Sequence, residues 1–208
     1  MTQAAREKRF VSAVILAAGS STRFAGDAPK QLTVVEGTSM VRRIAQAALA
    51  SKASEVIVVT GFQQARVAAE VKGFATHCVY NRRFQQGLST SVKTGLWAVS
   101  DRSSAVLFIA CDQPLLDTAT LDLLVDAYRR GRGSILVPSY RGRRGAPVLF
   151  DRKFFAELAA ITGDEGGRQV LLRHPADVVE VELPEEGPLL DFDTVEELEA
   201  LVGTGSAP

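Results

Sequence analysis

Two cations that follow a loop of small residues near the start of the chain could bind an anionic group. The loop is G-S-S-T at residues 19–22, and Arg23 and Lys30 come after it. Small side chains let the backbone N–H groups of such a loop approach a ligand closely. N–H groups beside fixed positive charge are typical of a site for the phosphates of a nucleoside triphosphate. Small polar loops also follow many strands that bind nothing, so the loop alone leaves both interpretations open.

A carboxylate later in the chain could complete this site. Asp112 stands in the sequence C-D-Q-P, directly after an apolar stretch at residues 105–110. Mg²⁺ is commonly held by one or two carboxylates together with substrate phosphates and water. The alternative is that Asp112 caps the helix that follows it. Cys111 is expected to be a small buried residue rather than a nucleophile, because no basic residue stands beside it.

A third polar stretch, at residues 81–91, leads into a predicted helix. Gly87 permits a tight turn there, and Ser89 and Thr90 are of the types that cap helix N-termini. The N–H groups at the start of that helix could meet a base, a ribose or a phosphate. An ordinary capped helix would look the same, so this stretch also leaves both alternatives open.

These residues need a framework that brings them together, and the hydrophobic pattern predicts one. An apolar run at residues 11–18 predicts a strand buried on both faces just before the glycine loop. Further strands are expected at 55–60, 75–79, 105–110, 134–138 and 178–183, with residues 147–150 pairing with the sheet in a different way. Helices are expected at 39–51 (with Ser39 as N-cap), 63–71, 90–99, 115–130, 151–161, 167–173 and 195–202. This alternation predicts an α/β fold with a mostly parallel sheet, whose ligands bind at the carboxyl ends of the strands.

Composition limits the partners. The 208 residues carry 24 basic and 24 acidic side chains, a balance that excludes a broad electrostatic footprint for nucleic acid or a membrane surface. The apolar run at residues 11–18 is too short to span a bilayer, and no signal-like segment is seen. Two cysteines without a pairing pattern indicate the reducing cytoplasm. One domain is expected over residues 11–202, between a flexible N-terminus (1–10) and a flexible tail (203–208).

Five motifs resemble those of one enzyme family. L-A-A-G-S-S-T-R-F-x-G-x-x-P-K, C-D-Q-P, G-L-S-T-S-V-K-T-G-L, G-R-R-G-A-P-V-L-F and L-L-D-F-D-T-V-E-E-L occur in the order seen in molybdenum cofactor cytidylyltransferases, which belong to the MobA-like nucleotidyltransferases. The resemblance extends over residues 11–201. The first motif is shared with many sugar-nucleotide and isoprenoid nucleotidyltransferases and so indicates only the superfamily. G-L-S-T-S and D-F-D-T-V-E-E-L occur in a narrower group of proteins.

The resemblance implies a Rossmann-like three-layer sandwich of the GT-A-like kind and a Mg²⁺-dependent reaction. CMP would pass from CTP to the phosphate of molybdenum-molybdopterin, with release of pyrophosphate. That phosphate is already an anionic nucleophile, so no Ser, Cys or His of the protein needs to attack. His77 and His174 accordingly lie outside the motifs.

Site residues are carried over from the family by position. Arg23, Lys30 and Asp112 would be catalytic, the first two by holding phosphates and Asp112 by binding Mg²⁺. The residues implied to bind the nucleotide are Leu16, Ala17, Ala18, Gly19, Ser20, Arg23, Lys30, Asn81, Gly87, Ser89 and Ser91. Asp193 is a candidate second metal ligand, with the alternative that it caps the helix at 195–202; Asp191 is a further candidate.

Two positions bear on the substrates. Relatives that use GTP tend to have L-A-G-G where this chain has L-A-A-G, and the methyl group of Ala18 would narrow the base pocket in favour of a pyrimidine. Relatives usually have His or Asn where this chain has Ala146, which leaves room for a different acceptor. Arg141, Arg143 and Arg144 nearby could attract an anionic acceptor or simply form a solvated loop.

Three alternatives stay open at this stage. The chain could use GTP or another acceptor within the same family. It could be an oxidoreductase, since proteins resembling this family have been described as reducing aromatic dyes with NAD(P)H, although G-x-G-x-x-G is absent from the sequence. It could instead carry the finished cofactor to a molybdenum hydroxylase without catalysis. Intact Arg23, Lys30 and Asp112 favour the transferase.

Overall fold

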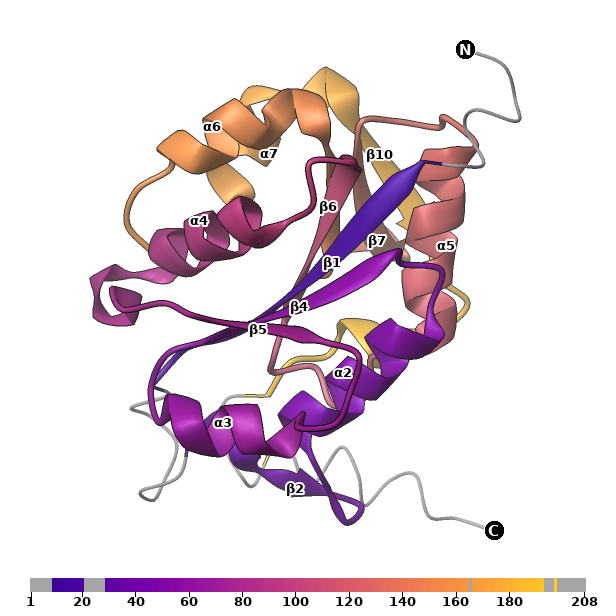
Figure 1. Cartoon of the computed structure of the whole chain (residues 1–208). Helices are drawn as coiled ribbons and strands as arrows, with labels where there is room; N and C mark the ends of the chain where they lie inside the picture. The colour runs from indigo at the N-terminus through magenta and orange to yellow at the C-terminus, as the bar shows by residue number, and fades with distance from the viewer. Residues whose placement is uncertain (1–8, 21–28, 165, 193–196, 198–208) are drawn as a thin grey trace, which may run out of the picture.

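The structure, a computed structural model, describes residues 9–20, 29–164, 166–192 and 197. A twisted central sheet lies between two layers of helices (Figure 1). The sheet strands are β1 (Phe10–Ala17), β4 (Glu55–Thr60), β5 (His77–Tyr80), β6 (Ser103–Ala110), β7 (Ile135–Tyr140), β8 (Arg143–Arg144), β9 (Val148–Asp151) and β10 (Val178–Glu182). Their order is β10-β7-β9-β6-β1-β4-β5, with β8 paired to β7. A separate hairpin joins β2 (Val34–Val35) to β3 (Thr38–Ser39).

Strand β1 lies at the centre of the parallel part of the sheet. It pairs in parallel with β4 on one side and β6 on the other, and β5 continues the sheet beyond β4. Only one long strand reverses the direction among those described, because β9 runs antiparallel to both β6 and β7. The predicted mostly parallel sheet is therefore confirmed, as is the different pairing expected of residues 147–150.

Alternate residues of β1 enter two separate cores. Val11, Ala13 and Ile15 pack into one core with α2 (Met40–Ala50), α3 (Gln64–Glu70) and α5 (Thr118–Arg129). Val14 packs into the other core with α4 (Leu88–Ala98), α6 (Phe155–Ala160) and α7 (Arg168–Arg173). The side chains of a strand point to opposite faces in turn, so a strand that is apolar at nearly every position must be covered twice. In the described part of the chain, no helix combines the length and the apolar character needed to span a bilayer.

Two helix starts differ from the prediction because remote or later residues provide the caps. Helix α5 begins at Thr118, three residues later than expected, where the carboxylate of Asp117 accepts from the N–H of Thr120 at 2.8 Å. The interpretation of Asp112 as the cap of this helix is therefore wrong. Helix α4 begins at Leu88, whose N–H donates to Oδ1 of Asp164 at 2.8 Å rather than to a cap within its own sequence. Ser39 precedes α2 as predicted, but its hydroxyl donates to Glu70 instead of capping the helix. The helix expected at 195–202 lies outside the described residues, Glu197 excepted.

Replacing Gly95 with alanine should destabilise the fold. Gly95 lies where α4 crosses β1 and β4, and a Cβ there would overlap Cγ1 of Val14 and lie 3.1 Å from Cγ2 of Val59. Overpacking of this kind outweighs the gain in helix propensity, and we expect a net loss of about 2 kcal/mol in the free energy of unfolding. Urea denaturation measures the loss. Gly187→Ala is the control, since its Cβ would have only ordinary contacts, the nearest being 3.5 Å from Leu115; equal midpoints for the two variants would contradict the packing account.

Candidate active site

Four segments from three distant parts of the sequence meet where β1 and β6 end. The loop after β1 contains Gly19, and its carbonyl accepts a 2.8 Å hydrogen bond from Nε2 of Gln31 in the short 3₁₀ helix Lys30–Leu32. Lys30 of the same helix places Nζ 3.9 Å from Oδ2 of Asp112, which follows β6. The N–H of Phe192 donates to the Asp112 carbonyl at 3.3 Å, and its ring lies 4.6 Å from the Lys30 ammonium. The structure thus brings Lys30 and Asp112 together at the edge of the sheet next to the glycine loop.

The two charged groups of this pair differ in exposure. Lys30 is 7% exposed, and a lysine so buried needs a partner such as the Asp112 carboxylate and the face of the Phe192 ring. The Asp112 side chain is 36% exposed, so part of the carboxylate is in contact with solvent. No cluster of three metal-ligating side chains occurs among the described residues. A single open carboxylate still fits Mg²⁺ or a similar ion, because substrate phosphates and water supply the remaining ligands.

Six of the predicted nucleotide-binding residues line one cavity of about 540 Å³, which we name the β1 cavity. These are Leu16, Ala18, Gly19, Ser20, Gly87 and Ser91. The other walls come from residues 84–86 and from Leu88, Gly163 and Asp164. Lys30 and Asp112 do not line this cavity themselves, but the hydrogen bond from Gln31 to Gly19 joins them to its wall. The cavity is large enough for a nucleoside and part of its phosphates.

The remaining predicted site residues lie elsewhere. Ala17 is fully buried in the sheet core. Asn81 is also buried, and its Nδ2 donates to Thr90 and Ser91 while its Oδ1 accepts from the N–H of Arg83. Asn81 and Ser89 line a neighbouring cavity rather than the β1 cavity. Asp191 is exposed beside Phe192, and Arg23 and Asp193 lie outside the described residues.

Sequence reasoning missed two residues that shape the β1 cavity. Gly61 directly follows β4, and a Cβ there would lie 2.5 Å from the carbonyl oxygen of Ala18, so only glycine lets the two loops approach. The neighbouring Phe62 N–H donates to that same oxygen at 3.1 Å. Asp164 both lines the cavity and caps α4. Gly61 could have been recognised from its position directly after the strand at 55–60, whereas no local sequence pattern marks Asp164.

A second cavity of about 520 Å³ adjoins the β1 cavity, and we name it the apolar cavity. It shares Leu16 and Leu88 with the β1 cavity, and its other walls include Phe108, Ala110, Ala146, Val148, Phe150, Leu171, Leu172 and the cationic Arg144 and Arg168. Nε2 of Gln113 donates to the carbonyls of Ala146 and Pro188 at 3.0 and 3.2 Å, which fixes the loop that bears Ala146. This cavity lies beside the ends of β1 and β6, because Leu16 and Ala110 are among its lining residues.

The arginine-rich loop beside the apolar cavity is largely neutralised by glutamates. Arg143 pairs with Glu186 at 2.9 Å and Arg144 with Glu180 at 2.7 Å, and both pairs are well exposed. The Arg141 guanidinium lies over the ring of Tyr140. Of the two alternatives for this segment, the structure therefore favours a solvated, ion-paired loop over a free anion-binding cluster.

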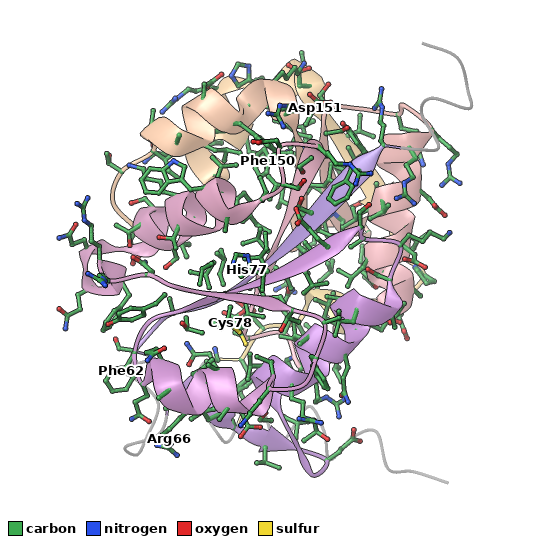
Figure 2. The ribbon with its side chains drawn as sticks, viewed as in Figure 1. Phe62, Arg66, His77, Cys78, Phe150 and Asp151 are labelled. Carbon is green, nitrogen blue, oxygen red and sulfur yellow. The ribbon has the colours of Figure 1, made fainter. Side chains whose placement is uncertain are left out.

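The two thiols should differ sharply in reactivity. Cys111 is buried beside Asp112, and burial followed by the Asp112 charge raises the pKa of its thiol far above the ordinary value. Cys78 is exposed on the edge strand β5 (Figure 2), although partial burial raises its pKa as well. We expect a thiol reagent at mildly alkaline pH to modify one cysteine in the native protein and two after denaturation, as counted by mass spectrometry. Rapid native modification of Cys111 would contradict the burial of this thiol.

Comparison with known proteins finds relatives that are similar over most of the chain. Residues 13–178 match the model of the MobA-like NTP transferase domain. Nicotine blue oxidoreductase of Paenarthrobacter nicotinovorans is 30% identical over 198 residues, which cover 92% of this chain and 96% of that protein. The structure of Rv0371c from Mycobacterium tuberculosis H37Rv is similar at a TM-score of 0.81 and 28% identity, over 94% of this chain and 98% of that one. A structure of Rv0371c in complex with manganese gives a TM-score of 0.78 at 27% identity, over 94% and 99% of the two chains.

Proposed function

Because this chain belongs to the MobA-like NTP transferase family, we propose that it transfers CMP from CTP to the phosphate of a molybdopterin-type acceptor, with release of pyrophosphate. One observation carries the proposal. Lys30 and Asp112, which are 82 positions apart in the chain, form a 3.9 Å pair next to the loop that walls the β1 cavity. A cation and an open carboxylate at that place are what a triphosphate and its metal ion require.

Each part of the site has a task in this reaction. The β1 cavity holds the nucleoside, and the small residues Gly19 and Ser20 let the phosphates approach the backbone. Lys30 stabilises the charge that develops at the α-phosphate, because its position is fixed before the reaction begins. Asp112 holds the divalent ion, which when bound neutralises phosphate charge and polarises the phosphoryl group. The acceptor phosphate attacks directly, so the protein provides alignment rather than a nucleophile. Arg23 is proposed to add a second cation.

The choice of CTP is supported by Ala18. Its methyl group is buried and lines the β1 cavity, where a glycine would leave more room for a purine. The acceptor is proposed to enter the apolar cavity, whose walls include Ala146 where relatives usually carry a polar side chain. A molybdenum hydroxylase is the proposed recipient of the product.

A second candidate function rests on the nicotine blue oxidoreductase relative. The name of that protein gives nicotine blue as the compound it acts on, and the apolar cavity of this chain is lined by Phe108 and Phe150, which could contact a flat aromatic ring. In this alternative, the chain would reduce an aromatic compound with NADH or NADPH. The Lys30–Asp112 pair has no evident task in hydride transfer, which is why we place the transferase first.

One set of assays separates the two functions. Pyrophosphate release is measured with CTP, GTP, ATP and UTP in the presence of Mg²⁺, with and without molybdenum-loaded molybdopterin. NADH and NADPH oxidation is followed by absorbance with an aromatic dye as acceptor. The proposal expects acceptor-dependent pyrophosphate release that is fastest with CTP. Release that is fastest with GTP would overturn the nucleotide assignment, and dye reduction without any pyrophosphate release would replace the transferase with the oxidoreductase.

A further inference from the structure

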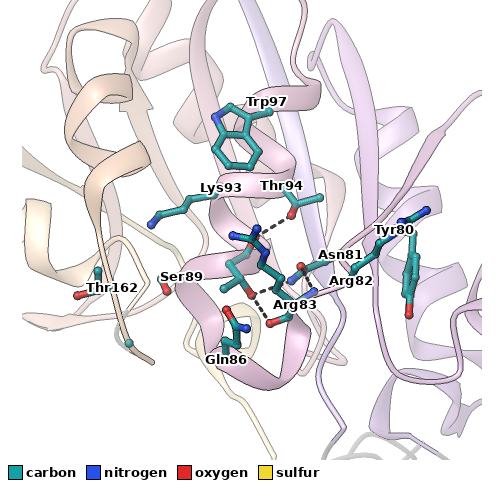
Figure 3. Close-up of a pocket in the computed structure, with 12 residues that line it drawn as sticks. Tyr80, Asn81, Arg82, Arg83, Gln86, Ser89, Lys93, Thr94, Trp97 and Thr162 are labelled. Carbon is teal, nitrogen blue, oxygen red and sulfur yellow. Dashed lines mark hydrogen bonds between the residues drawn. The ribbon is translucent and has the colours of Figure 1, made fainter.

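A third cavity, of about 530 Å³, has no task in the proposed reaction. It lies between α4, the chain from Tyr80 to Gln86, and residues 162–163 (Figure 3), and we name it the Trp97 cavity. It shares only Gln86 and Gly163 with the β1 cavity among its lining residues. Trp97 follows Leu88 of the β1 cavity by nine residues, about 14 Å along an α-helix. A ligand in the Trp97 cavity would therefore be separate from the reacting nucleotide.

The charges that line this cavity are all positive. Arg82, Arg83 and Lys93 contribute three cations, and none of the described lining residues is an acid. Within the described part of the chain, none of these three side chains takes part in an ion pair, whereas Arg143, Arg144 and Lys153 elsewhere on the surface each have a carboxylate partner. Like charges that gather without counter-charges repel one another and attract an anion. The cavity therefore favours a ligand with more than one negative charge.

Two exposed aromatic rings stand at the same cavity. Trp97 is 73% exposed and Tyr80 is 47% exposed, and both are among the most exposed large hydrophobic residues described. Exposing the large apolar ring of a tryptophan to water is unfavourable, and exposed tryptophans are enriched where proteins bind ligands or partners. A flat ring stacked on Trp97 would cover this surface.

The floor of the cavity is held rigidly. Nδ2 of Asn81 donates to Oγ1 of Thr90 at 2.8 Å, and the Thr90 hydroxyl donates to the carbonyl oxygen of Arg83 at 2.9 Å. The N–H of Arg83 in turn donates to Oδ1 of Asn81 at 2.9 Å. These bonds fix the segment that bears the arginines against α4. Lys93 and Trp97 are four residues apart and so lie on one face of that helix.

We propose that the Trp97 cavity binds a second nucleotide, with its base stacked on Trp97 and its phosphates held by Lys93 and Arg83. A mononucleotide combines the flat ring and the multiple negative charge that the lining residues require, and the cavity volume is in the range of small-molecule sites. A long nucleic acid strand is disfavoured by the balanced charge of the whole chain. This binding site is additional to the proposed transferase reaction and does not depend on it.

Trp97 reports on its own cavity because the chain has one tryptophan. Tryptophan fluorescence is titrated with ATP, with adenosine and with inorganic tripolyphosphate, all without divalent metal. We expect a saturable change with ATP at a concentration at least ten-fold lower than with adenosine or tripolyphosphate. Equal responses to ATP and tripolyphosphate would reduce the cavity to a general anion site and overturn the proposal. No response to ATP would overturn it too.

Variants locate the response. The double variant Arg83→Glu/Lys93→Glu should weaken the ATP response at least ten-fold, whereas Lys72→Glu, an exposed lysine outside all three cavities, should leave it unchanged. Circular dichroism verifies that both variants fold. Lys30→Met should retain the response, and its loss in that variant would assign the signal to the catalytic site and overturn the proposal. Acceptor-dependent pyrophosphate release at saturating CTP should be unaffected by Arg83→Glu/Lys93→Glu, so failure here and failure of the transferase proposal are distinguishable.

Discussion

Replacing Asp112 with asparagine should lower acceptor-dependent pyrophosphate release by about a thousand-fold, equivalent to about 4 kcal/mol in the activation free energy. The amide has the size of the carboxylate but no charge, so it binds a divalent ion weakly and leaves phosphate charge unneutralised. The fold should be retained, because the backbone carbonyl of Asp112 still accepts from Phe192 and the helix that follows is capped by Asp117. Steady-state rates across a range of Mg²⁺ concentrations provide the measurement.

The matched control for this variant is Asp126→Asn. Asp126 lies on α5 and pairs with Lys52 at 2.6 Å, far from the loop after β1 in the fold, so its loss should change neither rate nor Mg²⁺ dependence. Asp191→Asn tests the other described candidate for the metal. If the Asp112 variant turned over CTP at nearly the normal rate, Asp112 would not be the metal ligand, and a strong effect of Asp191→Asn would transfer that role.

Replacing Lys30 with methionine should lower the rate about a hundred-fold, since removing one preorganised charge from a transition state costs about 3 kcal/mol. Methionine keeps most of the length and volume of the buried lysine stem, whereas alanine would also leave a hole. Removing one member of a buried ion pair can destabilise the fold, because the other charge is then left buried without compensation. The Asp112 side chain is partly exposed to water, so its charge remains solvated in this variant. We therefore expect little change in the thermal midpoint.

The ratio of effects on kcat and KM gives this second variant its diagnostic value. A group that stabilises only developing charge lowers kcat and kcat/KM together, whereas a group that only holds the substrate raises KM. Lys52→Met is the control, as Lys52 is an exposed lysine that is likewise paired with an aspartate. A Lys30→Met enzyme with raised KM and unchanged kcat would keep Lys30 at the phosphates but remove it from the catalytic step.

The central sheet could be predicted from sequence because its signal is local. Residues 55–60 form a strand at the predicted bounds, and β1 and β6 differ from the predicted ranges by one or two residues at their ends. The meeting of Lys30 with Asp112 followed from topology, because neighbouring parallel strands deliver their following loops to one edge. The hairpin of β2 and β3 was missed, since its strands have two residues each and depend on one turn at Glu36 and Gly37.

Features that depend on distant partners could not be predicted. The cap of α4 comes from Asp164, 76 residues beyond Leu88, so local pattern placed the helix start two residues too late. Asn81 was predicted to lie near the nucleoside, whereas its amide donates to Thr90 and Ser91, nine and ten positions along the chain, and so holds its loop to α4. Nothing in the sequence indicated that Trp97 would face outward from a helix in which Val92 and Leu96 are buried. The roles of Arg23 and Asp193 stay predictions.

Strand β9 has a consequence through its direction alone. Its neighbours β6 and β7 both run the other way, so the beginning of β9, and not its end, faces the edge where Asp112 stands. Ala146 precedes that beginning and is tied to the edge by Gln113. The wall of the apolar cavity at Ala146 therefore belongs to the segment that leads into an antiparallel strand, and not to a connection between a parallel strand and a helix. A substitution before β9 can therefore change which molecule is accepted there, while the loop after β1, which is proposed to bind the triphosphate, stays unchanged.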